Sequence, residues 1–399
     1  MFLTRLLADN PRLPLAAVLA HQAGRLLSGT YLIDLDALSA NAALLADAAA
    51  ASGLSVYFMA KQFGRNPDAC RAAVRAGLPT AVAVDTQCLE AETRHGIPVG
   101  HAGHLVQPHR GSEAAIVAAR PEVVTVFTVD AARRIGAAAL AAGQVQDVLL
   151  RVQAPGDHFY FGHGGGFPLE TIEEAAQAVG AVPGVSVAGV TTFPCLLADA
   201  ASRTVIPTHN LGTLTEAARR LREAGVDVTQ VNAPGTTSAG TMEMLAKAGA
   251  THAEPGSALH GTTPLHVFDA GAPEIPAIVY VTEVSHLDGD DAYVFASGYY
   301  IDRVLGDYPL TALCGHDETL LERRLTVRTA AEGAIHYYAI IPEGRRHGVR
   351  PGDTVVFCFR PQTFVTRART QAVAGLSDGG AGDLLARYDQ EAHPVEGIS

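Results

Sequence analysis

The chain has 399 residues, of which 48% are hydrophobic and 18% are charged. This composition excludes a chain that stays disordered, and it is typical of a globular protein with a large core. The formal net charge of -12 argues against nucleic acid as the main partner, because binding to phosphates requires a basic surface. The length suits a barrel domain of about 250 residues and a smaller domain of roughly 100 to 150 residues.

The cysteines and the N-terminal region indicate the cellular setting. The five cysteines are scattered without CxxC spacing, which predicts reduced thiols in the cytoplasm and neither a disulfide framework nor a zinc site. The first 29 residues carry Arg, Asp, Pro, His and Gln within their apolar stretch. Such a stretch suits neither a secretory signal nor a membrane span, so we expect a helical extension and no membrane partner.

From residue 30 to residue 272, short apolar runs alternate with Ala-rich and Leu-rich segments of helical period. The runs that predict strands lie at 31 to 35, 56 to 60, 80 to 84, 104 to 107, 123 to 129, 148 to 152, 187 to 193, 228 to 233 and near His252. Roughly eight strand-helix units predict a (β/α)8 barrel or a long doubly wound sheet. We favour the barrel because no GxGxxG motif follows the first run.

The pattern changes at residue 273. Strand-like runs such as AIVYVTEV, DAYVFASGYY and DTVVFCF alternate with turn residues up to the C-terminus. They predict a barrel domain at 30 to 272 followed in the sequence by an all-β domain at 273 to 399.

Candidate functional residues follow the predicted strands, at the end of a barrel where chemistry is located. Lys61 ends a buried run, Gly235, Thr236 and Thr237 lie in a loop before a predicted helix, and Glu254 follows the last run. Separately, they are typical of a solvated lysine, an ordinary helix cap and a structural carboxylate. Together they match the needs of pyridoxal phosphate: a Schiff-base amine, phosphate donors and an acid for the ring nitrogen.

At this point the sequence resembles a known family. The segments YFMAKQFGRNP, GVTTFPC, NAPGTTSAGT and EPGSALHGTTPLH are similar to those of fold-type III pyridoxal phosphate enzymes, within them most of all to the YhfX-like group of alanine racemase-like proteins. The resemblance covers nearly the whole chain. It implies a barrel followed by a β domain, bound pyridoxal phosphate and an amino-acid substrate.

The resemblance also implies roles for individual residues. Lys61 would carry the cofactor as a Schiff base and act as the base on one face of the substrate Cα. Phe193 would stack on the cofactor ring, and the loop at 235 to 237 would hold the phosphate. Glu254 departs from the RPG pattern of alanine racemases and resembles the EPG of the related decarboxylases. A glutamate keeps the ring nitrogen protonated, which suits decarboxylation as well as racemisation.

The group on the opposite face of the substrate is less clearly marked. The resemblance points to Tyr299 in ASGYYIDR, reaching the site from a partner subunit, so a homodimer with active sites at its interface is implied. Tyr300 is a rival for this role. Cys314 is the other candidate, because the decarboxylases use a cysteine of the second domain, although a half-buried inert thiol is the favoured interpretation.

Three further residues have open interpretations. His163, in the Gly-rich segment PGDHFYFGHGGGFPLE, would approach the cofactor or lie at the surface. Arg360 and Arg367 would bind a substrate carboxylate or pair with acids of the second domain. No equivalent of the cofactor-contacting arginine of alanine racemases is evident in the Gly-rich segment.

The sequence therefore predicts an amino-acid racemase dependent on pyridoxal phosphate. A decarboxylase is the alternative that Glu254 and Cys314 motivate. A cofactor carrier without turnover is disfavoured because the second domain, whose counterpart completes the site in two-domain enzymes, is present. A Schiff-base barrel enzyme without the cofactor is the remaining alternative.

Overall fold

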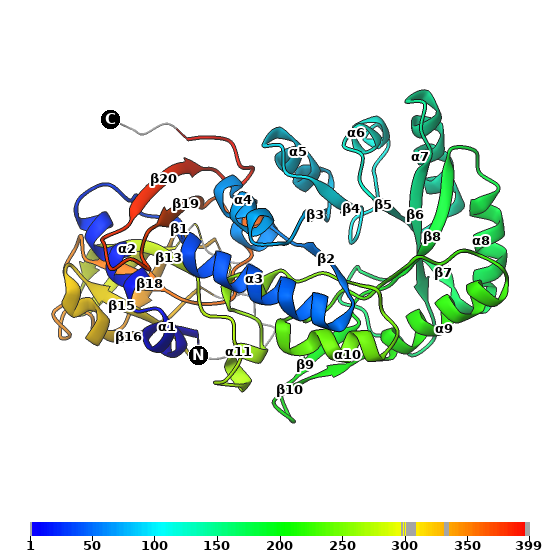
Figure 1. Cartoon of the computed structure of the whole chain (residues 1–399). Coiled ribbons are helices and arrows are strands. Elements are labelled where there is room, and N and C mark those ends of the chain that lie inside the picture. Colours follow the sequence, from blue (N-terminus) through cyan, green and yellow to red (C-terminus); the bar gives the residue numbers. More distant parts are fainter. Residues whose placement is uncertain (1, 297, 299, 301–308, 331–334, 396–399) are drawn as a thin grey trace. The chain divides into compact units, whose positions relative to one another are not determined.

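The computed structural model describes residues 2–296, 298, 300, 309–330 and 335–395 (Figure 1). It divides into two compact units. The barrel unit consists of Ala42–Ala60 and Ala73–Ala258. The sheet unit consists of Met1–Asn41, Lys61–Ala72 and Leu259–Ser399. Among the described helices, none has both the length and the apolar character needed to cross a membrane.

The barrel unit contains a closed sheet of eight parallel strands, which confirms the predicted fold class (Figure 1). Its strands are β2 (Ser55–Phe58), β3 (Thr80–Ala83), β4 (Val99–Ala102), β5 (Val123–Val126), β6 (Gln146–Gln153), β8 (Val185–Thr191), β11 (Gln230–Asn232) and β12 (His252–Ala253). The strand order is β5-β4-β3-β2-β12-β11-β8-β6, and pairing of β5 with β6 closes the ring. Closure leaves the carboxyl ends of all eight strands at one rim.

Helices alternate with the strands, as predicted. Those of the barrel unit are α3 (Leu35–Ser52), which follows β1 (Thr30–Asp34) and starts in the sheet unit, α5 (Thr86–Arg94), α6 (Glu113–Ala118), α7 (Val129–Ala141), α8 (Ile172–Gly180), α9 (His209–Glu223) and α10 (Met242–Lys247). Local capping explains where two of them begin: Asp85 accepts a hydrogen bond from the amide of Cys88 (2.7 Å), and Thr128 accepts one from Ala131 (3.1 Å). Smaller additions are β7 (Phe167–Pro168) and the hairpin of β9 (Leu196–Asp199) and β10 (Thr204–Pro207).

Gly189 allows the strands β8 and β11 to lie close together in the barrel. Gly189 in β8 pairs with Gln230 in β11, and a Cβ atom at position 189 would overlap the Gln230 carbonyl oxygen. We expect Gly189→Ala to lower the free energy of unfolding by on the order of 3 kcal/mol, because the strand pair must separate. Urea unfolding measures this change.

Gly212→Ala is the matched control for that measurement. Gly212 lies exposed in α9 with no atom within 4 Å of its Cβ position. Alanine there is expected to raise stability by about 0.5–1 kcal/mol, because it restricts the unfolded chain and favours the helix. Equal losses in both variants would show that the close approach of β8 and β11 is unimportant.

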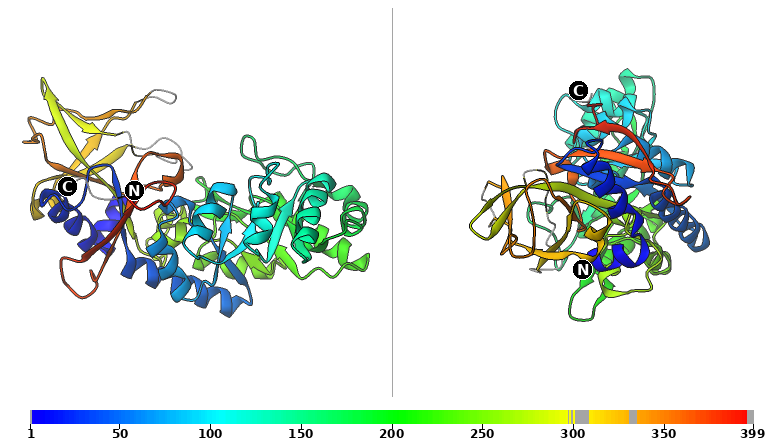
Figure 2. Two further views of the ribbon diagram at one scale, coloured as in Figure 1. Left: turned by 90° about the horizontal axis from the view of Figure 1, so that it is seen from above. Right: turned by 90° about the vertical axis from the view of Figure 1, so that its left-hand side faces the viewer.

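The sheet unit is built on a second, mostly antiparallel sheet, seen from two further sides in Figure 2. Its main path is β16-β15-β18-β13-β1-β19-β20. These strands are β1 (Thr30–Asp34), β13 (Ile278–Asp288), β15 (Leu310–Gly315), β16 (Arg324–Val327), β18 (Thr354–Phe357), β19 (Arg369–Ala374) and β20 (Asp383–Tyr388), with β14 (Asp291–Phe295) and β17 (Tyr338–Ile341) at its side. The helices are α1 (Phe2–Asp9), α2 (Arg12–Gln22), α4 (Pro67–Arg75), which ends in the barrel unit, and α11 (Leu265–Phe268).

The prediction that residues 31 to 35 form the first barrel strand is wrong. Tyr31 in β1 pairs antiparallel with Tyr280 of β13 and parallel with Thr370 of β19, so blue and red segments meet in this sheet in Figure 1. All five residues of β1 are buried. A strand buried on both faces has no alternation that would distinguish one sheet from another. The stretch 30 to 272, predicted as one barrel domain, therefore contributes to both units.

The N-terminal helices belong to the core of the sheet unit. Leu6 of α1 and Leu13 and Val18 of α2 are buried in one apolar cluster with Val281 of β13 and Val356 of β18. The predicted helical extension is thus part of the second hydrophobic core.

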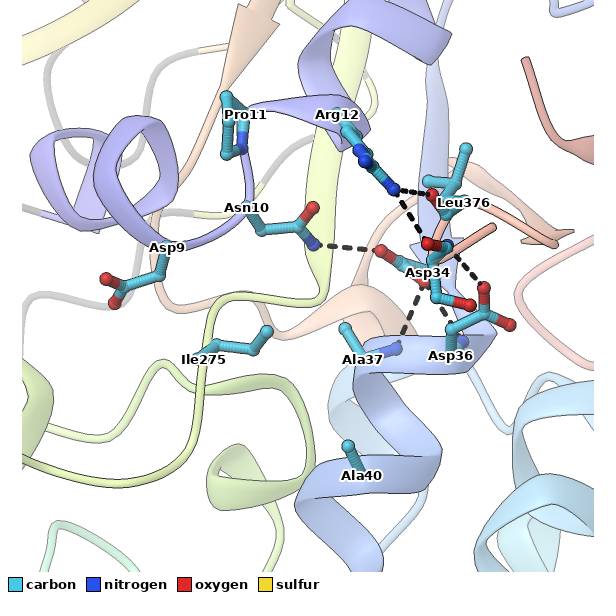
Figure 3. A pocket seen from close by; sticks show the side chains of 11 residues that line it. Asp9, Asn10, Pro11, Arg12, Asp34, Asp36, Ala37, Ala40, Ile275 and Leu376 are labelled. Atoms are coloured by element: carbon cyan, nitrogen blue, oxygen red, sulfur yellow. Dashed lines mark hydrogen bonds between the residues drawn. The ribbon is translucent and has the colours of Figure 1, made fainter. Parts of the chain in front are cut away.

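Asp34 links β1 to the start of α3 (Figure 3). Its Oδ1 accepts hydrogen bonds from the amides of Asp36 (3.0 Å) and Ala37 (3.1 Å), and its Oδ2 accepts one from Asn10 (2.9 Å). Burial raises the pKa of Asp34 despite these donors. The adjoining cavity is about 350 Å³, and Arg12 at its edge donates to the carbonyl of Leu376 (2.7 Å). Its polar groups serve the fold by tying the N-terminal segment to the sheet.

Candidate active site

Glu254 is the one acid among the predicted site residues, and it is buried. It follows β12 and is 2% exposed. Its Oε1 accepts hydrogen bonds from Nδ1 of His101 (2.6 Å) and Nδ2 of Asn232 (2.8 Å), while Nε2 of His104 lies 3.4 Å from its Oε2. Burial alone would raise the pKa of Glu254, but the neighbouring imidazoles and the amide outweigh it and lower the pKa to about 2. Glu254 is therefore a carboxylate at neutral pH.

His101 connects three strands through the barrel interior. It lies in β4, with Glu254 opposite, and its Nε2 is 2.5 Å from the hydroxyl of Thr125 in β5. Asn232 comes from β11. Since barrel interiors are usually filled by branched apolar side chains, this buried polar layer is an exception. Such exceptions are more often found where chemistry occurs than where packing alone matters.

Aromatic rings gather beside His104. The Phe193 ring lies edge-on to His104 with 5.6 Å between centroids, and its distances to Tyr160 and His163 are 5.7 and 5.9 Å. The structure thus brings the predicted residues Phe193 and His163 near Glu254 through His104. Phe193 is half-buried, so part of its ring surface is open to stacking.

Arg151 is a functional candidate that the sequence analysis missed. It is 1% exposed in β6, and its guanidinium carbon lies 5.1 Å from the Phe127 ring centroid. It donates to the carbonyls of His163 (3.0 Å) and Phe193 (3.3 Å). Burial lowers the pKa of Arg151 to about 10, which still leaves it charged at neutral pH. This buried cation holds the Gly-rich segment against the loop that carries Phe193.

The predicted phosphate loop is a tight turn. The amide of Thr236 donates to the carbonyl of Leu196 (3.1 Å), and the amide of Thr237 donates to the carbonyl of Gly235 (2.9 Å). A Cβ atom on Gly235 would lie 2.6 Å from the Leu196 amide nitrogen, so the position requires glycine. The helix expected after the loop is short: a 3-10 turn at Ala239–Thr241 precedes α10. Phosphate binding by 235 to 237 stays a prediction.

Lys61 lies in the sheet unit, directly after the apolar pair Met59 and Ala60 that follows β2. It begins the 3-10 turn Lys61–Phe63, and its Nζ lies 5.2 Å from the ring centroid of Phe364. The hydroxyl of Thr363 donates to the carbonyl of Gln62 (2.7 Å), and Gly64 continues the turn with a φ of +68°. The lysine therefore stands on an anchored backbone rather than on a loose loop.

The other predicted residues of the sheet unit are less central. Cys314 is buried in β15, where burial raises its thiol pKa to about 12, which favours the inert interpretation. Arg360 is half-buried and Arg367 is exposed. Tyr300 is 50% exposed, and Tyr299 lies outside the described residues. Their catalytic roles stay predictions.

The side chains of His101, His104 and Glu254 also have the composition of a metal site. One ligand atom from each lies within 4.8 Å of the others. The 2.6 Å contact between Nδ1 of His101 and Oε1 of Glu254 is nevertheless too short for two ligands of one ion, which stand about 3.3 Å apart around tetrahedral zinc. The geometry favours a hydrogen-bonded cluster.

His252 predicts a pH effect on stability. Its ring stacks on Tyr57 at 5.2 Å, and burial lowers its pKa to about 4 from the ordinary 6.5. Because the unfolded chain binds this proton more readily, the stabilisation is complete above pH 6.5 and is lost as the pH falls from 6.5 towards 4. We expect a loss of about 2 to 3 kcal/mol from this group. Urea unfolding of wild type and His252→Asn at several pH values gives the free energy of unfolding as a function of pH. The same pH dependence in both proteins would contradict the prediction.

A closed eight-stranded barrel together with a mostly β unit defines the alanine racemase-like architecture. The alanine racemase N-terminal domain family matches residues 33–264, and the YhfX-like C-terminal domain family matches residues 279–382. A protein of Escherichia coli (strain K12), described as "Uncharacterized protein YhfX", is 37% identical over 389 residues, or 98% of each chain. The chain therefore belongs to the alanine racemase-like family of pyridoxal phosphate proteins, in the group with a YhfX-like C-terminal domain.

Solved structures share the fold at low sequence identity. D-threonine aldolase from Filomicrobium marinum has a TM-score of 0.67 and 17% identity, covering 92% of this chain and 96% of its own. D-threo-3-hydroxyaspartate dehydratase from Delftia sp. HT23 has a TM-score of 0.67 and 17% identity, covering 90% and 97%. Alanine racemase from Corynebacterium glutamicum has a TM-score of 0.60 and 16% identity, covering 85% and 92%. One architecture thus supports several reactions.

Proposed function

We propose that the protein is a pyridoxal phosphate-dependent amino-acid racemase. The observation that carries the proposal is the buried Glu254 carboxylate. Its Oε1 is taken by two donors, whereas its Oε2 accepts no hydrogen bond within the described part of the chain. A buried carboxylate oxygen in this state needs an N–H partner, and the protonated ring nitrogen of pyridoxal phosphate supplies one. The chain's family membership points to the same cofactor.

Bound pyridoxal phosphate makes the Cα–H bond of an attached amino acid acidic. In the proposed reaction, Lys61 would hold the cofactor until the substrate amine displaces it, and its freed amine would then remove the α-proton. Glu254 would keep a proton on the ring nitrogen, and Phe193 would pack against the ring. A second group, for which Tyr299 of a partner subunit is the candidate, returns a proton on the opposite face. This last role requires a homodimer.

Exchange of the α-proton tests the reaction directly. Purified protein loaded with pyridoxal phosphate is incubated with single L- and D-amino acids in deuterated water, and deuterium content and chirality are followed. A racemase yields both enantiomers with deuterium at Cα. If no amino acid exchanges its α-proton while the cofactor stays bound, the racemase proposal is wrong and a carrier without turnover replaces it.

Lyase reactions are distinguished from racemisation in the same experiment. A decarboxylase, which the EPG motif with Glu254 favours, releases carbon dioxide. Because two neighbouring structures are an aldolase and a dehydratase, the panel includes β-hydroxy amino acids. Release of an aldehyde or a keto acid from these substrates, without racemisation, would assign the protein to the lyases.

A further inference from the structure

The hydrogen bonds of the polar layer inside the barrel all run in one direction from donor to acceptor. Glu254 is accept-only as a carboxylate, so the 2.6 Å contact with His101 requires the proton on Nδ1 of the imidazole. In the neutral ring, Nε2 then accepts, and the hydroxyl of Thr125 at 2.5 Å is its donor. The chain of donors therefore runs from Thr125 through His101 to Glu254, across the strands β5, β4 and β12.

This direction makes the two carboxylate oxygens unequal. Oε1 of Glu254 accepts from His101 and also from Asn232 at 2.8 Å. Oε2 accepts no hydrogen bond from the described residues and faces Nε2 of His104 at 3.4 Å. With Oε1 engaged by two donors, the carboxylate cannot rotate without breaking both bonds.

We propose that His101 is a positioning residue that aims Glu254, so that Oε2 is presented to the ring N–H of the bound cofactor. This inference rests on the proposed function, because the ring N–H belongs to pyridoxal phosphate. His101 does not itself touch the cofactor in this role. Thr125 supports it by holding the tautomer that donates from Nδ1.

The proposal predicts selectivity for a ring that carries a nitrogen. The probes are pyridoxal phosphate and its deaza analogue, in which a C–H group replaces the ring nitrogen. Apo protein is titrated with each, and affinity is read from absorbance and fluorescence. We expect wild type to bind pyridoxal phosphate at least about tenfold more tightly than the analogue, the range of a hydrogen bond to a charged group.

Three variants test the chain of donors. His101→Leu removes the donor to Oε1, and we expect it to weaken pyridoxal phosphate binding by about tenfold or more while changing analogue binding by less than about threefold. His101→Asn places an amide nitrogen near the former Nδ1 and is expected to rescue part of the preference. Thr125→Val should reduce the preference in the same direction, because Nε2 loses its donor. If His101→Leu fails to fold, His101→Asn and Thr125→Val test the preference for pyridoxal phosphate in its place.

His252→Asn is the matched control. It removes an imidazole from β12, but that imidazole bonds to Thr251 (2.8 Å) rather than to Glu254. The preference for pyridoxal phosphate should be unchanged in this variant above pH 6.5. A loss as large as in His101→Leu would mean that any buried histidine of the barrel affects loading, and it would overturn the positioning role.

The remaining outcomes separate the inference from the proposed function. If wild type binds pyridoxal phosphate but His101→Leu weakens both probes equally, His101 is structural and only the inference fails. If wild type binds pyridoxal phosphate and the analogue equally tightly, Oε2 of Glu254 is not directed at the ring N–H, and again only the inference fails. If wild type does not bind pyridoxal phosphate, both fail. Zn²⁺ binding that disappears in His101→Leu, with no preference between the probes, would assign the cluster to a cation instead.

Discussion

Lys61→Ala is expected to reduce turnover by about a thousandfold or more, because one side chain supplies both the covalent attachment and an acid-base group. The sequence contains only two lysines, Lys61 and Lys247, so the attachment site can be identified without ambiguity. Borohydride reduction of the loaded protein, followed by peptide mass analysis, should place the cofactor on Lys61. The variant should lose the visible absorbance of the attached cofactor.

Lys247→Ala is the control for this result. Lys247 ends α10 and pairs with Glu243 on the exposed helix surface, with 2.6 Å between the charged atoms. An exposed pair of this kind contributes little to stability, so turnover and absorbance should stay at the wild-type level. Labelling of Lys247 in place of Lys61 would contradict the assignment of the Schiff-base lysine.

Glu254→Gln is expected to reduce turnover by about a hundredfold or more. The amide has nearly the same shape but no charge, so it cannot hold a proton on the ring nitrogen. The pKa of Glu254 lies near 2, below its ordinary 4.5. The carboxylate therefore stabilises the fold above pH 4.5, and this contribution is lost as the pH falls towards 2. The Gln variant should lack that acid-dependent part of the stability curve.

Two measurements separate these effects. Steady-state kinetics gives the loss of turnover, and urea unfolding between pH 7 and pH 3 gives the stability curve. Glu254→Asp keeps the charge on a shorter side chain, so it should retain the acid-dependent stability in part while turnover still falls. Wild-type turnover in Glu254→Gln would exclude a function for the protonated ring nitrogen.

The barrel could be predicted because each strand-helix unit repeats a local pattern that one sequence displays. Lys61 and Glu254 could be singled out for the same reason, since both are charged residues directly after apolar runs. His101 gave a weaker signal: it is a single polar residue inside the short strand VGHA. Its importance depends on Glu254 and Thr125, which are far away in the sequence.

Arg151 shows a different reason for a missed site residue. The family resemblance implies a cofactor-contacting arginine in the Gly-rich segment. The buried arginine lies instead in the preceding strand β6, and it donates to the carbonyl of His163 in that segment and to the carbonyl of Phe193. Carbonyl acceptors have no signature in side-chain identity. The loop at 235 to 237 was predicted to bind phosphate from its composition, yet its hydrogen-bonded turn could not be derived from glycines and threonines alone.

The place of β1 in the second sheet affects how the chain is made and recombined. β1 leaves the ribosome early, but its neighbours β13 and β19 are synthesised only after the whole barrel. The nascent chain therefore keeps β1 without its partner strands at least until β13 has been synthesised. A chimera that exchanges only the C-terminal segment with a relative would join a foreign sheet to a native central strand, so a successful graft has to carry Thr30–Asp34 as well.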